Sequence, residues 1–351
     1  MFTSHKRAAI VAMFTGIAVL SSGIAVAQQK AEALLEFNYG IPNANHASVF
    51  VAQDLGLFEK VGLKPKFFVF QSGAPLLAGL KSESLDVVTA GLALALALGQ
   101  NIPLKFIFWE ANSAVSEGLV VDPKSGIKSY RDLAKAKKIG AATGTCAQVA
   151  LYMMAKKAGI DYSKLDVVNL PAPLFRNAFM SGSIDAGVAW PPFSLQLQSE
   201  GYPIAAFDSE YTPPGGLCPG LTAARPAFLK QHPQIGLKLV QVEAMAREAI
   251  ANNPQLAADA YIKRQNLSPE VAKAVVEREC CDRGIPSFAQ QLDPKSPYSM
   301  TAKEGGLAEK LYIAIEALHA MKAIPEKIPL SAIQEAVDPT YLREYMKSIG
   351  K

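Results

Sequence analysis

Histidine and cysteine are scarce in this sequence, with four residues of each among 351. No CxxC pair occurs and the histidines are far apart in the chain, so the ligand spacing of a zinc site is missing. Cys280 and Cys281 are adjacent, and adjacent cysteines rarely bond to each other because the small ring strains the peptide between them. The cysteines therefore predict isolated thiols or one disulfide of unknown partners, and we expect neither a metal site nor a cofactor.

A basic stripe is also lacking. Lysine and arginine together exceed aspartate and glutamate by four, 35 against 31, but the positive residues are scattered and are not interleaved with aromatic ones. The electrostatic footprint of a nucleic-acid-binding protein is absent, so we expect no nucleic-acid partner. Outside the N-terminus the most continuous apolar run is residues 91–98, which is too short to cross a bilayer and predicts a buried helix.

The N-terminus has the pattern of a secretion signal. Polar residues at 5–7 precede an apolar stretch at 8–20, and the small residues 25–27 form a signal-peptidase motif. We predict a signal peptide over residues 1–27 with cleavage after Ala27, which places the mature protein in the periplasm. No cysteine follows the cleavage point to accept lipid, so a free periplasmic protein is expected. An uncleaved membrane anchor is the alternative.

Segments of strand and helix length alternate along the rest of the chain, which predicts an α/β fold. Strands are predicted at residues 34–39, 66–70, 87–89, 104–109 and 184–190, and long helices at 235–252, 254–265, 269–278, 303–321 and 339–348. Their order predicts a discontinuous lobe I, residues 28–120 plus 221–351, and a continuous lobe II, residues 121–220. Two chain crossings would form the hinge, and the ligand would lie between the lobes at the C-terminal ends of the strands.

One strand-helix junction has the composition of an anion-binding loop. A short apolar strand at 138–142 runs into Thr143, Gly144, Thr145 and Cys146, where a helix begins. The first N–H groups of a helix have no partner inside it, so these residues are candidates to hold a ligand. No arginine lies in this loop, which favours a sulfonate over a multiply charged phosphate. An ordinary N-cap is the alternative.

Other candidate ligand-binding residues follow the predicted strands of both lobes. Each of them stands where a strand reaches the predicted cleft or where the next helix begins. A carboxylate there would suit an ammonium or an aminopyrimidine, and two indoles could face each other across the cleft. The candidates of this kind are Gln71, Ser72, Gly73, Gly91, Trp109, Glu110 and Trp190. Core or hinge packing is the alternative for both tryptophans.

Three motifs in the second lobe carry a family resemblance. They are Gly144-Thr145, the turn at 181–186 (Ser-Gly-Ser-Ile-Asp-Ala) and Trp190-Pro191-Pro192, in this order. Together they resemble the periplasmic solute-binding proteins of ABC importers that handle nitrate, sulfonates, taurine and pyrimidine precursors of thiamine. The resemblance implies the type II periplasmic binding protein fold. Cys146 stands where serine or threonine is common in sulfonate-binding relatives, and a thiol is the weaker donor.

A second resemblance concerns the first lobe. The segment 42–47 followed by Gly56-Leu57-Phe58 is similar to the opening of proteins that bind pyrimidine precursors of thiamine. It implies that Asn43 and His46 contact the ligand, whereas capping of the following helix by Asn45 or His46 is the alternative.

The resemblances predict a binding protein without catalytic residues. We expect a monomer that captures a small organic solute, sulfonate- or taurine-like or a related organic acid, and delivers it to an ABC permease in the inner membrane. A thiamine pyrimidine precursor or another aromatic heterocycle is the alternative ligand. A pyrimidine-synthase-like enzyme and a stand-alone sensor are the alternatives from other classes.

Overall fold

Two five-stranded sheets form the framework of the protein. The computed structural model describes residues 1, 33–280 and 284–351, and residues 34–351 form one compact unit. The predicted signal peptide therefore lies outside the described residues, apart from Met1. Among the described residues, no helix is both long and apolar enough to cross a membrane.

The first sheet has the order β2-β1-β3-β10-β4. β1 pairs in parallel with β2 and β3, while β10 runs antiparallel to β3 and β4. Its strands are β1 (Leu35–Pro42), β2 (Leu63–Phe70), β3 (Val87–Ala90), β4 (Lys105–Asn112) and β10 (Pro219–Ala224). Because β10 comes so late in the sequence, this sheet is built from two separated parts of the chain.

The second sheet has the order β7-β6-β8-β5-β9. β6 pairs in parallel with β7 and β8, and β5 runs antiparallel to β8 and β9. Its strands are β5 (Gly118–Val121), β6 (Ile139–Ala141), β7 (Val167–Asn169), β8 (Ala186–Ala189) and β9 (Ile204–Phe207). The α/β class and the two-lobed architecture expected from the sequence are confirmed.

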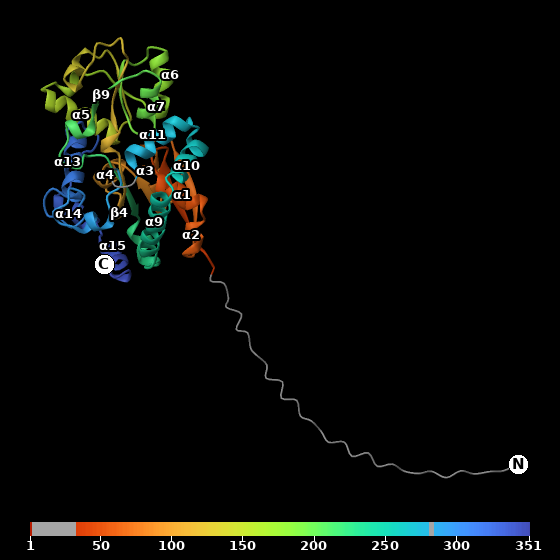
Figure 1. Cartoon of the computed structure of the whole chain (residues 1–351). Helices are drawn as coiled ribbons and strands as arrows, with labels where there is room; N and C mark the ends of the chain where they lie inside the picture. Colours follow the sequence, from red (N-terminus) through yellow and green to blue (C-terminus); the bar gives the residue numbers. More distant parts are fainter. Residues whose placement is uncertain (2–32, 281–283) are drawn as a thin grey trace. The chain divides into compact units, whose positions relative to one another are not determined.

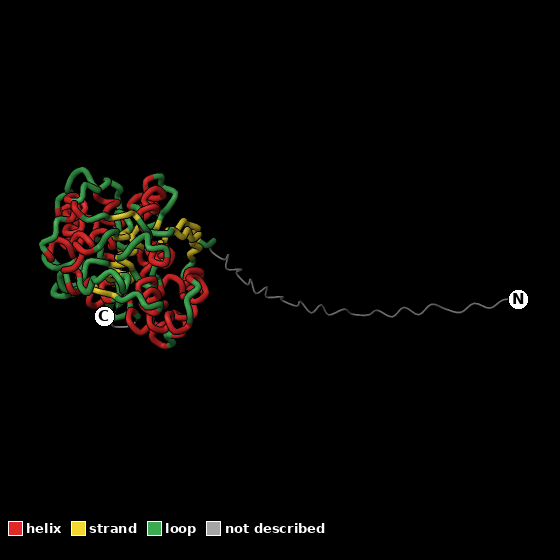
Figure 2. Tube along the Cα trace, turned by 90° about the horizontal axis from the view of Figure 1, so that it is seen from above, coloured by secondary structure: helices red, strands yellow, loops and turns green. Residues whose placement is uncertain are grey.

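Helices pack around most of the strands, and some strands lie at the edge of the unit (Figure 2). Helices α5, α6 and α7 lie around the second sheet, and α9, α14 and α15 lie toward the opposite end of the unit (Figure 1). The α-helices that precede the second crossing are α1 (Ala47–Asp54), α2 (Leu57–Lys60), α3 (Gly73–Lys81), α4 (Ala93–Gly99), α5 (Cys146–Ala158), α6 (Phe175–Met180) and α7 (Phe193–Ser199). Those that follow it are α8 (Pro226–Gln231), α9 (Ile235–Asn252), α10 (Gln255–Gln265), α11 (Pro269–Glu279), α12 (Phe288–Leu292), α13 (Leu307–Ala320), α14 (Leu330–Ala336) and α15 (Thr340–Ser348).

The chain passes between the sheets twice. The first crossing follows β4 through the short 3-10 helix η1 (Ser113–Val115), and the second follows β9 through η5 (Asp208–Glu210). The lobe boundaries expected near residues 120 and 220 fall inside β5 and β10. The exact division into lobes remains a prediction.

Each sheet has its own apolar core, and the two cores interleave between the sheets. Ala44, in the loop after β1, belongs to the core of the second sheet, whereas Cys146 and Val149 of α5 belong to the core of the first. Helix α4 is buried along its whole length, as its uninterrupted apolar sequence predicts. The loops of the two halves therefore pack into each other between the sheets.

Candidate functional site

A cavity lies between the two sheets, at the place where their loops interleave. Its volume is about 50 Å³, enough to hold several water molecules, each of which needs about 10–15 Å³. Its first-sheet side consists of Pro42, Ala44, Asn45, His46, Gly73, Gly91, Leu92, Ala93 and Ala111. The crossings and the second-sheet side add Ser113, Glu117, Thr145, Cys146, Trp190, Cys218, Pro219 and Gly220. No lysine or arginine is among these described lining residues, so the cavity suits a small solute with little net charge.

The topology explains why these residues meet. Pro42 is the last residue of β1, and Gly73 and Ala93 begin α3 and α4. Open α/β sheets place ligands outside the carboxyl ends of their strands, where helices start. Of the residues predicted from the sequence, six line the cavity: His46, Gly73, Gly91, Thr145, Cys146 and Trp190.

The loop before α5 differs from the expected anion loop. The N–H of Thr143 donates to Asn169 Oδ1 at 2.9 Å, and the N–H of Gly144 donates to Gln148 Oε1 at 2.7 Å. Both amides are thus occupied by side chains of the protein, and neither residue lines the cavity. Thr145 lines it, but its hydroxyl donates to the Ala142 carbonyl at 2.8 Å. The donors left for a ligand are the N–H groups in the first turn of α5, from Cys146 onward.

The two tryptophans do not face each other across the cavity. Trp190 lines the cavity, and its indole N–H donates to the carbonyl oxygen of Asn43 at 3.1 Å. Trp109 is 0% exposed and packs edge-on against Tyr298, with ring centroids 5.6 Å apart. Trp109 does not line the cavity, because its side chain lies in the apolar core of the first sheet.

Glu110 supports the site instead of lining it. It is 1% exposed, and its carboxylate accepts from Ser48 Oγ at 2.8 Å and lies 3.1 Å from His46 Nδ1. With Nδ1 held by Glu110, the other ring nitrogen of His46, Nε2, is buried without a partner in the described part of the chain. The ring nitrogen of His46 without a partner among the described residues is therefore Nε2, and Glu110 does not line the cavity.

The remaining predicted residues lie beside the cavity. Gln71 is exposed, and Ser72 is buried at the N-cap position of α3 without capping its helix by a side-chain hydrogen bond. The side chain of Asn43 accepts a hydrogen bond from Gln265 Nε2 at 2.9 Å, so only its backbone reaches toward Trp190.

Several polar lining residues were missed from the sequence. Asn45 Nδ2 donates to Glu279 Oε2 at 2.7 Å, and Ser113 Oγ donates to Asn45 Oδ1 at 3.1 Å. Burial raises the pKa of Glu279 to about 8, against the opposing effect of the hydrogen bond from Asn45. The sequence suggests Asn45 only as a cap of the following helix, because the Glu279 carboxylate that holds its side chain lies 234 residues away.

Glu117 is the carboxyl group that lines the cavity. Burial raises its pKa well above the ordinary value, and the nearby carboxyl groups of Asp208 and Glu279 raise it further. Its Oε1 is buried without a partner among the described residues, and its Oε2 lies 3.1 Å from Cys218 Sγ. One feature of the sequence could have indicated Glu117: it is an acidic residue directly before the apolar segment 118–121, where the chain first crosses between the sheets.

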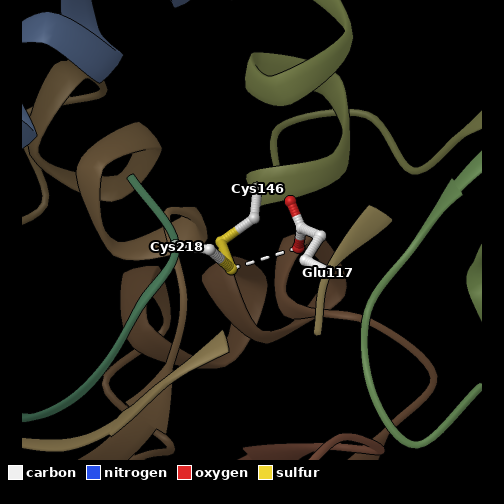
Figure 3. Close-up of side chains that lie close together, drawn as sticks. All are labelled: Glu117, Cys146 and Cys218. Atoms are coloured by element: carbon white, nitrogen blue, oxygen red, sulfur yellow. Dashed lines mark hydrogen bonds between the residues drawn. A yellow bond between two sulfur atoms is a disulfide. The ribbon is translucent and has the colours of Figure 1, made fainter. Parts of the chain in front are cut away.

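Cys146 and Cys218 form a disulfide beside Glu117 (Figure 3). The sequence allowed one disulfide without indicating its partners, and the structure shows that they are Cys146 and Cys218. Cys280 is buried, and Cys281 lies outside the described residues. The potential ligand atoms of Glu117, Cys146 and Cys218 lie within 4.8 Å of one another, the arrangement a metal ion would need. Because the two sulfurs are bonded to each other, they are not available as thiolate ligands in this state.

Comparisons with known proteins agree with this architecture. The chain is 29% identical over 223 residues to a protein of Bacillus subtilis (strain 168) named for the binding of aliphatic sulfonates. That alignment covers 63% of this chain and 66% of the relative, so it spans slightly less than two thirds of the relative's length.

Solved structures share the fold at low sequence identity. The alkanesulfonate-binding protein SsuA from Xanthomonas axonopodis pv. citri, bound to MOPS, aligns with a TM-score of 0.72 and 19% identity over 88% of this chain and 99% of that chain. The periplasmic nitrate-binding protein NrtA from Synechocystis PCC 6803 aligns with a TM-score of 0.72 and 10% identity over 90% and 89% of the two chains.

A family model described as NMT1/THI5 like matches residues 43–257, which include most of the cavity lining. Because this match covers more than half of the chain, the protein belongs to the NMT1/THI5-like family, and it has the two-lobed fold of periplasmic binding proteins.

Proposed function

We propose that this protein is the solute-binding subunit of an ABC importer, that it works in the periplasm as a monomer, and that it has no catalytic role. Its mature form begins after Ala27 in this proposal, with lobe I formed by residues 28–120 and 221–351 and lobe II by residues 121–220. Closure of the lobes traps the solute in the cavity, and the closed protein docks on the permease. The family, the fold and the names of the similar proteins support this assignment.

The observation that carries the proposal is the lining of the cavity. Both halves of the unit contribute to it, and two buried polar atoms there, His46 Nε2 and Glu117 Oε1, lack partners among the described residues. Buried polar atoms in folded proteins are nearly always hydrogen-bonded, so such atoms around a cavity indicate a ligand or ordered water. A small solute with complementary polar groups would satisfy them.

A small sulfonate with an amine, such as taurine, fits these groups best. Helices α3 and α5 begin at the cavity with Gly73 and Cys146, and their first N–H groups favour a singly charged anion. Glu117 would face the ammonium, whose positive charge would stabilise the ionised carboxylate that burial disfavours. A related small organic acid would use the same helix ends.

A thiamine pyrimidine precursor is the second candidate, and Glu117 and Trp190 are the observations that favour it. A protonated carboxyl can donate to a ring nitrogen and accept from an exocyclic amine at the same time. Trp190 supplies an aromatic surface in the same cavity.

A thermal-shift screen of residues 28–351 tests the proposal, using taurine, alkanesulfonates, nitrate, small carboxylic acids and aminopyrimidines. The screen is run with and without a reductant, because the Cys146–Cys218 disulfide lines the cavity and could block entry of the compounds. A ligand at about a hundred times its dissociation constant should add about 2.7 kcal/mol to the free energy of unfolding.

Matched variants locate the site. Glu117→Gln should remove the preference for taurine over ethanesulfonate, whereas Asp166→Asn, an exposed carboxylate away from the cavity, should bind as the native protein does. No shift with any of the compounds under either condition would overturn the ligand assignment.

A further inference from the structure

The Cys146–Cys218 disulfide joins the two halves of the protein at the cavity. Cys146 is the first residue of α5, which packs on β6 and β8 of the second sheet, and Cys218 directly precedes β10 of the first. The two residues are 72 positions apart in sequence, and their Cα atoms are 5.4 Å apart. Both cysteines line the cavity. Figure 3 shows their bond beside the carboxyl group of Glu117.

The Cys218 end is anchored to the crossings. Its carbonyl accepts from the N–H of Ser113 at 3.0 Å, and the N–H of Leu217 donates to Asp208 Oδ2 at 2.9 Å. The Lys310 ammonium donates to the carbonyl of Gly216 at 2.9 Å. The loop before β10 is therefore held in place on both sides of the disulfide, and it cannot easily follow α5 when the lobes separate.

The Cys146 end is pressed against the first lobe. The N–H of Leu92 donates to Cys146 Sγ at 3.4 Å, and a methyl group added at Gly91 would lie 2.7 Å from that sulfur. Opening of the lobes would move the start of α5 away from Gly91 and Leu92. The disulfide opposes this movement, because bonded cysteines usually keep their Cα atoms within about 6.8 Å.

Other contacts between the halves are noncovalent. The Trp190 indole donates to the Asn43 carbonyl, and α5 packs against α13. A single hydrogen bond contributes only about 1 kcal/mol, so such contacts can break during a binding cycle while a disulfide cannot. We propose that the Cys146–Cys218 disulfide is a redox-sensitive clasp across the cleft, and that its reduction releases the lobes and permits solute exchange. The link to solute exchange rests on the proposed function, whereas the clasp itself does not.

Glu117 is placed to donate a proton to the Cys218 sulfur when the disulfide is reduced. Its Oε2 lies 3.1 Å from Cys218 Sγ, and because a disulfide sulfur carries no hydrogen, a hydrogen bond there requires a protonated carboxyl. Burial favours that protonated form by raising the pKa of Glu117.

The reaction is a thiol–disulfide exchange with an external thiol reductant. One external thiolate attacks the Cys146 sulfur and forms a mixed disulfide with it, while the Cys218 sulfur leaves and becomes a thiol by taking the Glu117 proton. A second external thiol cleaves the mixed disulfide. Two electrons pass from the external thiols to the cysteines, which end as two thiols, and the external thiols end as one disulfide. Glu117 gives its proton to the Cys218 sulfur as that sulfur leaves and regains one from solvent.

The test uses Trp190 as its reporter. The sequence has two tryptophans, so Trp109→Phe leaves Trp190 as the single emitter. Quenching of its fluorescence by acrylamide is measured before and after reduction with a phosphine. We expect several-fold stronger quenching after reduction, and Cys146→Ser in the same background should show the strong quenching without reductant. Equal quenching in the oxidised, reduced and Cys146→Ser proteins would overturn the clasp.

If Trp109→Phe folds poorly, amide hydrogen exchange on the unmutated protein tests the same proposal. Reduction should speed amide exchange at residues 91–96 and 143–149, with little change in β1 and β2. Peptide mapping of the air-oxidised protein should recover Cys146 linked to Cys218, and recovery of both as thiols would contradict the proposal. Neither readout requires a ligand, so failure of the clasp is distinguishable from failure of the solute assignment.

Glu117→Gln separates proton donation from mere packing. It should slow reduction by dithiothreitol several-fold and flatten the dependence of that rate on pH, while the final extent of reduction stays similar. An unchanged rate and pH profile would remove Glu117 from the mechanism.

Discussion

The indole N–H of Trp190 donates to the backbone carbonyl of Asn43 at 3.1 Å and so ties the end of β8 to the end of β1. This hydrogen bond joins the two lobes at the edge of the cavity. Trp190→Phe keeps an aromatic ring but removes the donor, at a cost of about 1 kcal/mol to the closed state. We expect the dissociation constant of the solute, measured by isothermal titration calorimetry, to rise about fivefold. The melting temperature of the solute-free protein should change little. An unchanged affinity would show that this contact does not stabilise closure.

Gly91 gives the disulfide the space that it occupies. A Cβ at this position would lie 2.7 Å from Cys146 Sγ, closer than van der Waals contact allows. Gly91→Ala should therefore lower the free energy of unfolding by about 1–3 kcal/mol, measured by urea denaturation.

A double-mutant cycle identifies the cause of that loss. In a Cys146→Ala background the offending sulfur is gone, so Gly91→Ala should cost clearly less there. If Gly91→Ala lowers the free energy of unfolding equally in both backgrounds, the loss does not come from contact with the Cys146 sulfur.

The sequence predicted much of the fold for local reasons. Strand and helix periods placed β1, β3, β4 and the buried helix α4, and the rule that ligands lie at the carboxyl ends of strands led to Gly73 and Gly91. The rule that the first N–H groups of a helix lack partners led to Thr145, which lines the cavity, and to Gly144, which does not.

The errors arose where partners are distant in sequence. The amide of Thr143 is occupied by Asn169, and Glu110 is turned toward His46 and Ser48. Glu117 and Cys218 reach the cavity only because the two crossings lie side by side, with the Ser113 N–H donating to the Cys218 carbonyl. No periodicity in a single sequence reports such a juxtaposition.

Glu279 makes stability depend on pH. Its pKa is raised by burial to about 8, so the folded protein holds a proton that the unfolded chain, with the ordinary carboxyl pKa near 4.5, releases. Stability from this group is fully present below about pH 4.5 and is lost as pH rises to about 8, with a slope of at most about 1.4 kcal/mol per pH unit.

Chemical denaturation between pH 5 and pH 8 checks this prediction. Glu279→Gln should flatten the profile, whereas Glu277→Gln, on the exposed side of the same helix, should leave it as in the native protein. A native profile that rises with pH over this range, and that Glu279→Gln does not alter, would contradict the assigned pKa direction.

The disulfide should also stabilise the fold. It closes a loop between residues that are 72 positions apart, and the loss of chain entropy in the unfolded state predicts a contribution of about 4 kcal/mol. The Cys146→Ser/Cys218→Ser protein should unfold at lower urea concentration than the oxidised native protein, while reduced native protein should resemble the variant. Coincident unfolding curves for the oxidised and reduced protein would rule this contribution out.

The central claim, that the cavity between the lobes binds a small sulfonate-type solute, is tested most directly by calorimetric titration of reduced residues 28–351 with taurine and ethanesulfonate. We predict saturable binding of one solute per chain, tighter for taurine, with the preference lost in Glu117→Gln and kept in Asp166→Asn. Absence of binding to either compound, or binding that Glu117→Gln leaves unchanged, would contradict it.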